Sequence, residues 1–143
     1  MIHKLINEKY LILNKMIQQK KISESYKGPL IIDTYAFKKK SKESLFGNFV
    51  KRCFKLDLNE FILSYRSKQS SKKILYQISL FKVCKVAGEC ESKGPWPFGI
   101  SIYTDTRLFE LFFQNSMDYN VWIEALSACE CISSRPEIKV LSA

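Results

Sequence analysis

From residue 30 onwards the chain changes its hydrophobic period once, near residue 116, and this change limits the folds open to it. Before this point the apolar residues lie in short runs that alternate with polar ones, which is typical of strands. After it they recur three and four residues apart, which is typical of a helix. Trp122 lies in the middle of this second pattern. The sequence therefore predicts an antiparallel β fold that ends with one helix.

The C-terminal helix is predicted to run from Ser116 to Ile132. Ser116 is a common N-cap residue type, and Asp118 would meet the positive end of the helix. Arg135-Pro136 would end it, because proline cannot continue a helix. The predicted apolar stripe consists of Met117, Val121, Trp122, Ala125, Leu126, Cys129 and Ile132. We assign Trp122 a structural role, because a large side chain in such a stripe buries much apolar area.

Seven strands are predicted ahead of this helix. Each run is rich in β-branched and aromatic residues, and polar or Gly- and Pro-containing segments separate most of them. The first three runs are close enough to form a meander of antiparallel strands. The runs are residues 30–38, 49–57, 60–67, 74–80, 81–88, 98–104 and 107–115.

The first strand has a preferred register. Asp33 would be expensive to bury, so the opposite set of residues is expected to face the core. Lys38 then emerges on the inner side at the open end of the sheet, whereas a slip of one residue would substitute Lys39. The inward set consists of Leu30, Ile32, Thr34, Ala36 and Lys38.

A separate amphipathic helix is predicted from Ile2 to Lys21, ahead of a polar segment, 23–29, that ends in Gly-Pro. Three readings of this helix remain open: its apolar side packs onto the following domain, it is simply a flanking segment, or it lies as a basic helix in a membrane interface. Its stripe consists of Ile2, Leu5, Ile6, Tyr10, Leu13 and Ile17. We place the helical extension at 1–25, the domain at 26–135 and a tail at 136–143.

The positive charge is concentrated in the first part of the chain. The formal net charge is +9, and all of this excess lies in residues 1–56, because residues 57–143 carry equal numbers of basic and acidic side chains. Such a directional field attracts an anionic partner, either a membrane surface or a nucleic acid. Its densest part begins at the end of the first predicted strand and comprises Lys38, Lys39, Lys40, Lys42, Lys51, Arg52 and Lys55.

Composition disfavours metal sites and catalysis. The five cysteines are an odd number without a C-x-x-C pair, and with the single histidine, His3, they do not match zinc-site spacings. His3 lies in the helical extension, so no histidine-based catalytic partnership can be assembled within the domain. No glycine-rich phosphate loop leads from a strand into a helix. We expect no cofactor, no metal and no enzymatic activity.

We expect a cytoplasmic location. Reduced cysteines are typical of cytosolic proteins. The chain has no run of about 18 apolar residues that could span a bilayer, and the Met1 end lacks a signal-peptide cleavage site. Ile2 occupies the position that glycine would need for N-myristoylation.

The segment NSMDYNVWIEAL resembles the acidic, Trp-centred helix that closes pleckstrin homology (PH) domains, and residues 26–133 resemble that family throughout. The resemblance implies a seven-stranded, strongly bent antiparallel barrel with one end plugged by the C-terminal helix. Trp122 lies where the family's tryptophan is expected.

In phosphoinositide-binding members of the family, a basic residue at the end of the first strand and a Lys/Arg-x-Arg triplet in the second strand bind head-group phosphates. Lys38 and Arg52 match two of these three positions, whereas Val50 occupies the third. Lys51 does not replace it, because side chains alternate along a strand and Lys51 should point away from a pocket that Arg52 enters.

Two further positions of the tightest-binding members depart from the family pattern. A third-strand tyrosine falls on Leu63, and a fourth-strand basic residue falls on Leu75. These departures argue against high specificity for one lipid. The predicted head-group ligands are Lys38, Lys39, Lys40, Lys42, Lys51 and Arg52.

Two apolar residues, Leu45 and Phe46, lie at the tip of the loop that follows the first strand. Beside basic residues they could insert into a membrane interface, where burying each would be worth about 1.5–3 kcal/mol. The alternative is that they pack against Phe49 or the N-terminal segment. Trp96 has two readings as well, as a contact residue or as a side chain that covers one side of the barrel.

The sequence therefore predicts a non-catalytic adaptor that binds phosphoinositide or phosphatidic acid head groups and docks peripherally on membranes. The alternative is a protein–protein interaction scaffold, because the same fold also binds proteins. Nucleic acid is a weaker candidate, because the aromatic residues alternate within strands and do not interleave with the basic cluster.

Overall fold

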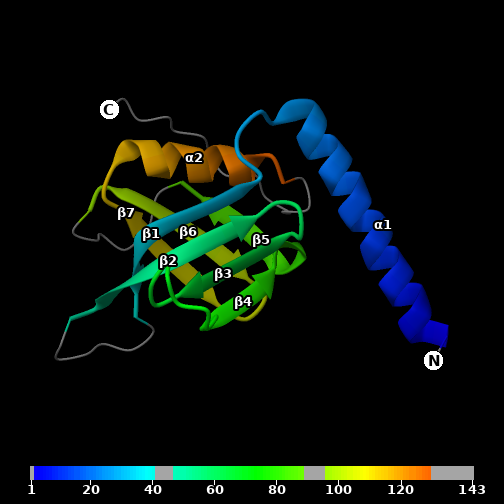
Figure 1. Cartoon of the computed structure of the whole chain (residues 1–143), viewed down its shortest axis with the longest axis horizontal. Helices are drawn as coiled ribbons and strands as arrows, with labels where there is room; N and C mark the ends of the chain where they lie inside the picture. Colours follow the sequence, from blue (N-terminus) through cyan, green and yellow to red (C-terminus); the bar gives the residue numbers. More distant parts are fainter. Residues whose placement is uncertain (1, 41–46, 89–95, 130–143) are drawn as a thin grey trace.

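The computed structural model describes residues 2–40, 47–88 and 96–129, with side chains from residue 7 onwards. An N-terminal helix, α1 (Ile2–Ser25), precedes seven strands, and a second helix, α2 (Ser116–Ser127), follows them (Figure 1). A short 3-10 helix, η1 (Leu80–Lys82), lies where the fourth and fifth predicted runs meet. The strands are β1 (Ile31–Lys39), β2 (Phe49–Asp57), β3 (Ile62–Arg66), β4 (Tyr76–Ser79), β5 (Val83–Ala87), β6 (Phe98–Thr104) and β7 (Leu108–Phe113).

The described strands form one antiparallel sheet with the order β4-β3-β2-β1-β7-β6-β5. The sheet curls into a half-barrel, and α2 lies across it (Figure 1). The predicted bent, seven-stranded antiparallel fold with a C-terminal helix is therefore confirmed. β1 lies at the centre of the order and pairs with both β2 and β7.

The predicted register of β1 is confirmed along most of the strand. Ile32, Ala36 and Lys38 are buried and Thr34 is half-buried, whereas the residues between them are exposed or half-buried. The expectation for Leu30 is wrong, because this side chain is 44% exposed. Sheet pairing begins only with Ile31 opposite Asp57, so Leu30 lies outside the part of the sheet that covers the core.

The inner face of α2 packs into the curl of the sheet. Trp122 is fully buried, and its ring lies 5.6 Å from that of Phe113 on β7 and 6.4 Å, edge-on, from that of Phe54 on β2. Tyr119 and Ile123, which the predicted stripe left out, are also buried. The structural role assigned to Trp122 thus has a direct basis in its contacts.

Three details of the predicted helix are wrong. The N-cap is Asn115 and not Ser116, because the Asn115 side chain accepts a hydrogen bond from the Asp118 backbone N–H at 2.9 Å. The helix ends at Ser127. Met117 is 71% exposed, because it lies five residues before Trp122 and so about 140° away around the helix. Ile132 lies outside the described residues.

The C-terminal half of α1 is attached to the turn between β2 and β3. Ile22 is buried in the core, and Lys15 forms an ion pair of 2.5 Å with Glu60. Gln19 Nε2 donates a hydrogen bond of 2.6 Å to the carbonyl of Asn59.

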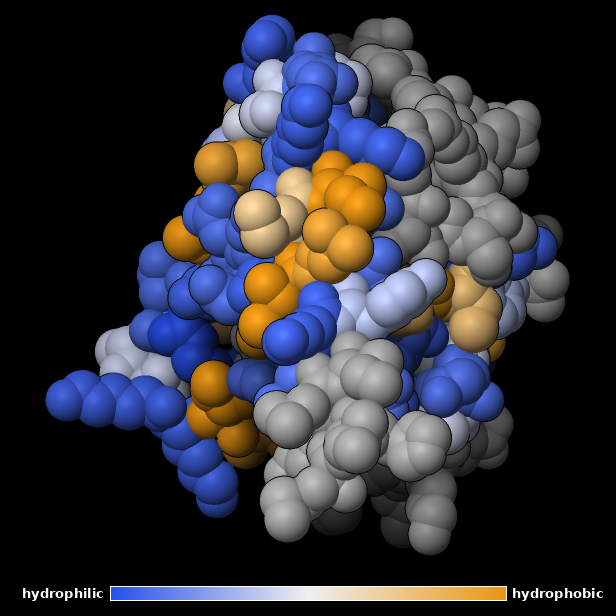
Figure 2. Space-filling view, turned by 90° about the vertical axis from the view of Figure 1, so that its right-hand side faces the viewer, coloured by the Kyte–Doolittle hydropathy of each residue, from blue (hydrophilic) through white to orange (hydrophobic). Residues whose placement is uncertain are grey.

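The middle of α1 lies away from the domain and exposes apolar side chains (Figure 1). Tyr10, Leu13 and Ile17 are 42–65% exposed, so the reading in which this stripe packs onto the domain is wrong for these residues. Apolar surface is visible on this side of the molecule (Figure 2). No helix in the described ranges is both long and apolar enough to span a membrane.

We expect Trp122→Ala to lower the free energy of unfolding by about 3–5 kcal/mol, because it removes the largest side chain of the core. Urea unfolding followed by circular dichroism would measure the loss. Met117→Ala, on the exposed side of the same helix, is the matched control and should change stability by about 0.5 kcal/mol or less. Equal effects of the two variants would contradict this account of α2.

Candidate functional site

Lys38 and Arg52 lie on the inner face of the sheet near its open end. Lys38 pairs with Val50, and Ala36 pairs with Arg52, so both cations are on the same side of β1 and β2. Lys38 is 7% exposed, and its ammonium lies 5.8 Å from the ring centre of Tyr65. The sequence prediction of this placement is confirmed for both residues.

A third cation, Arg107, lies beside them at the start of β7. Its guanidinium lies 4.7 Å from the ring centre of Tyr76 and 4.4 Å from that of Phe109, so two aromatic rings hold it. The sequence analysis missed Arg107. The available signal was its position directly after the Asp105-Thr106 turn, but only the β1–β7 pairing shows that this turn returns to the end of β1.

The electrostatics of this group follow from its burial. The pKa of Lys38 is lowered, first because burial removes water from the ammonium and then because Arg107 and Arg52 repel it. A bound anion would relieve both effects, since it supplies negative charge where solvent is partly excluded. We call Lys38, Arg52 and Arg107 the cationic rim.

The third-strand position next to Lys38 is Tyr65, so the assignment of that position to Leu63 is wrong. Tyr65 pairs with Phe54 and its ring stacks on Tyr76, whereas Leu63 is buried and pairs with Leu56 deeper in the sheet. The aromatic pair Tyr65 and Tyr76 therefore forms the wall of the rim.

The other predicted cations lie around the rim in different orientations. Lys51 points to the outer face, 5.0 Å from the ring centre of Tyr35, which confirms that it faces away from Arg52. Lys39 is exposed and forms an ion pair of 3.5 Å with Glu110. Lys40 is half-buried, and its backbone N–H donates to the carbonyl of Asn48. Lys42, Leu45 and Phe46 lie outside the described residues.

A pocket of about 330 Å³ opens between the end of β1 and the start of β7. It contains four cations and one carboxylate, which suits a compact anion better than an extended apolar ligand. The lining residues are Lys38, Lys39, Lys40, Arg107, Leu108 and Glu110.

Trp96 covers part of the outer face next to this region. Its ring stacks on Phe37 at 4.0 Å and meets Phe49 edge-on at 5.7 Å. Phe112 on β7 lies 6.4 Å away on the same side. Because Trp96 is half-buried in this cluster, the reading as a side chain that covers one side of the sheet is supported.

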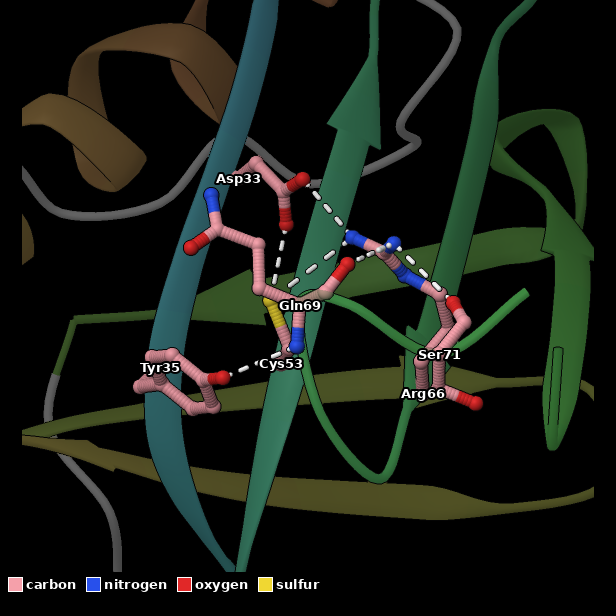
Figure 3. Close-up of polar contacts among 6 residues, drawn as sticks. All are labelled: Asp33, Tyr35, Cys53, Arg66, Gln69 and Ser71. Carbon is pink, nitrogen blue, oxygen red and sulfur yellow. Dashed lines mark hydrogen bonds and ion pairs between the residues drawn. The ribbon is translucent and has the colours of Figure 1, made fainter. Parts of the chain in front are cut away.

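A polar network on the outer face joins β1, β2 and β3 (Figure 3). The Cys53 thiol donates to one oxygen of Asp33 at 2.8 Å, and Arg66 donates to the other at 2.7 Å. Burial and the neighbouring Asp33 raise the pKa of Cys53 to about 11. Cys53 is therefore held as a neutral thiol and is a poor nucleophile.

The same network holds the β3–β4 connection against the sheet. Arg66 also donates to the carbonyls of Gln69 at 2.7 Å and Ser71 at 3.3 Å, and the backbone N–H of Gln69 donates to the Tyr35 hydroxyl at 2.8 Å (Figure 3). The adjoining groove of about 440 Å³ contains both Asp and Lys side chains, so it does not favour one sign of ligand. No cluster of three potential metal-ligating side chains occurs in the described ranges.

Comparison with known proteins identifies the family. The family model for the PH domain matches residues 25–130. The chain belongs to the PH domain family. PH domains commonly bind phosphoinositides or mediate protein interactions, and they are generally non-catalytic modules. Among curated protein sequences, none matched the chain.

Solved PH domains share the fold at low sequence identity. The human PH domain of pleckstrin homology domain-containing protein family A member 5 is 17% identical, with a TM-score of 0.55, 68% of this chain covered and 74% of that one. The human PH domain of oxysterol binding protein-related protein 11 is 15% identical, with a TM-score of 0.55 and coverages of 74% and 82%.

A structure of Vav1 bound to an allosteric inhibitor matches a larger share of this PH-domain chain. It is 15% identical, with a TM-score of 0.53, and covers 83% of this chain but only 22% of its own. Its described GEF activity belongs to that larger protein. At these identities the similarity shows the fold alone.

We expect the protein to lose stability as the pH rises from about 9 to about 11, in part through Cys53. The unfolded thiol ionises near the lower value, and the folded thiol ionises near the upper one, so the unfolded state releases a proton first and is favoured. Thermal unfolding measured across this pH range should show that Cys53→Ala loses less stability per pH unit than wild type. Cys84→Ala, at an exposed cysteine, should retain the wild-type slope; identical slopes for all three would contradict the assignment.

Proposed function

We propose that this chain is a non-catalytic PH-domain protein that binds anionic phospholipid head groups, phosphoinositide or phosphatidic acid, and docks peripherally on membranes from the cytoplasm. One observation carries the proposal: Lys38, Arg52 and Arg107 converge on one end of the sheet, and Lys38 is desolvated there. In this proposal residues 26–135 form the binding domain, 1–25 a helical extension and 136–143 a tail.

The cationic rim supplies the direct phosphate contacts. Arg52 and Arg107 can each donate two hydrogen bonds to phosphate oxygens, whereas Lys38 acts as a point charge. Lys38 and Arg107 start from restrained positions, because aromatic rings lie against both. Less side-chain entropy is then lost on binding.

The surrounding lysines supply the long-range attraction. Lys39, Lys40 and Lys51 lie around the rim, and we assign Lys42 to the same role. Each basic residue near an anionic leaflet is worth about 1 kcal/mol, so four or five give about 4–5 kcal/mol, which corresponds to millimolar or slightly tighter affinity. Insertion of Leu45 and Phe46 would add to this attraction, and it remains a prediction.

We expect wild-type protein to sediment with vesicles that contain phosphoinositide or phosphatidic acid and to do so less at higher salt. Lys38→Gln, Arg52→Gln and Arg107→Gln should each weaken binding about fivefold, the equivalent of about 1 kcal/mol. Lys82→Gln is the matched control, because η1 is joined to the turn at the opposite end of the sheet, where the Leu80 backbone N–H donates to the Phe61 carbonyl. Wild-type protein that stays in the supernatant would overturn the proposal.

The alternative function, a protein–protein interaction scaffold, is favoured by the exposed apolar residues of α1. Tyr10, Leu13 and Ile17 are spaced three and four residues apart, which is the spacing of a coiled-coil seam, and Met16 lies beside them. A surface of this kind can pair with its own copy across a two-fold axis. The occupant that we infer is a second copy of the chain.

Light scattering of the purified protein should then give twice the 16.7 kDa chain mass at high concentration. The double variant Leu13→Lys and Ile17→Lys should give the single-chain mass, because it places charges in the seam. Glu8→Lys, at another exposed position that lies off the seam, should leave the dimer intact. A wild-type protein that is monomeric at every concentration would exclude self-association through α1.

A further inference from the structure

Three large apolar side chains are exposed beside the cationic rim. Ile74 and Leu75, which directly precede β4, are 50% and 42% exposed, and Leu108 at the start of β7 is 45% exposed. They belong to other segments than Leu45 and Phe46, the residues that the sequence predicts to insert into a membrane. Single exposed apolar residues are common on protein surfaces, so the meaning of these three depends on what lies next to them.

The contact between Arg107 and Tyr76 brings the two apolar segments to the same open end of the half-barrel. In the strand order, β3, β2 and β1 separate β4 from β7. The Arg107 guanidinium nevertheless lies 4.7 Å from the ring centre of Tyr76 on β4. Leu75 is the chain neighbour of Tyr76, and Leu108 is the chain neighbour of Arg107. The two leucines therefore lie directly beside this contact, one on the β4 side of the open end and one on the β7 side.

Basic side chains accompany the apolar ones on both sides. Lys72 and Lys73 are exposed and directly precede Ile74. Leu108 lines the pocket of about 330 Å³ together with Lys40 and other cations. Apolar side chains next to cations match the boundary of an anionic membrane, where negative head groups lie above the acyl chains. The occupant that we infer for this surface is the lipid bilayer, because the same end of the sheet carries the proposed head-group site.

We propose that Ile74, Leu75 and Leu108 form an apolar collar that enters the acyl boundary of the membrane when the cationic rim binds a head group. The inference rests on the proposed head-group function and adds a second, apolar contribution to it. Salt screens the attraction between the cations and the membrane, whereas the gain from removing apolar surface from water does not depend on that screening. The collar therefore keeps the protein on the membrane at salt concentrations that weaken the attraction of the cations.

The first test measures sedimentation of the full chain with phosphatidylcholine vesicles that contain either an inositol bisphosphate lipid or phosphatidic acid, at two salt concentrations. The double variant Leu75→Gln and Leu108→Gln should weaken binding about tenfold or more at both salt concentrations, because it replaces apolar side chains that leave water on docking. Lys38→Gln should weaken binding mainly at the lower salt concentration.

The matched control is Ile31→Gln. Ile31 is 49% exposed, and it lies at the opposite end of β1 from Lys38. This variant should change binding about twofold or less, because that end of the strand does not meet the membrane in the proposed orientation. Thermal unfolding of each variant identifies losses that come from misfolding.

A second test detects insertion directly and does not require the double variant to fold. The added tryptophan of Leu108→Trp should lose fluorescence on vesicles whose acyl chains are brominated, beyond the loss that wild type shows through Trp96 and Trp122. Ile31→Trp should lose no more than wild type.

Each outcome separates the collar from the head-group function. If Lys38→Gln weakens binding but the double variant binds like wild type and Leu108→Trp shows no added quenching, the collar is wrong and the head-group function stands. If Ile31→Gln weakens binding as much as the double variant does, the effect is one of general hydrophobicity and the collar is again wrong. If wild type binds neither kind of vesicle, the proposed function fails and the inference with it.

Discussion

Burial of Trp122 in the curl of the sheet is the interaction on which the rest of this molecule depends. Its ring meets Phe54 of β2 and Phe113 of β7, the two strands on either side of β1. The contact therefore joins α2 to the two strands that flank β1. Trp122 thus packs against the strands on both sides of β1, which carries Lys38.

The cationic rim lowers the stability of the folded state. Three cations with a common sign lie close together, and one of them, Lys38, is largely removed from water. Aromatic faces compensate in part, because Tyr65 lies near Lys38, and Tyr76 and Phe109 lie against Arg107. An anion bound at the rim would reduce the repulsion among these cations.

The sequence could predict which face of a strand a side chain occupies, but not which distant strands are neighbours. Period-two alternation placed Lys38 inside and Lys51 outside correctly, because β1 and β2 are adjacent and half-buried. Arg107 was missed because its proximity to Lys38 depends on the β1–β7 pairing of residues far apart in the chain. That Tyr65 and not Leu63 lies beside Lys38 depends on how far β3 extends toward the rim. That Asn115 and not Ser116 caps α2 depends on a choice between two adjacent residues that are both good N-cap types.

Two ion pairs on the outer side of the sheet differ in how completely each carboxylate is satisfied. Asp33 accepts hydrogen bonds on both carboxylate oxygens, from Arg66 at 2.7 Å and from Cys53 at 2.8 Å, and the same arginine ties down the β3–β4 connection. Glu110 is more buried, yet its ion pair with Lys39 is looser, at 3.5 Å. A carboxylate that accepts two short hydrogen bonds holds both of its partners in place, whereas one with a single long ion pair restrains its partner less. The difference between the two acids lies in their partners and not in their charge.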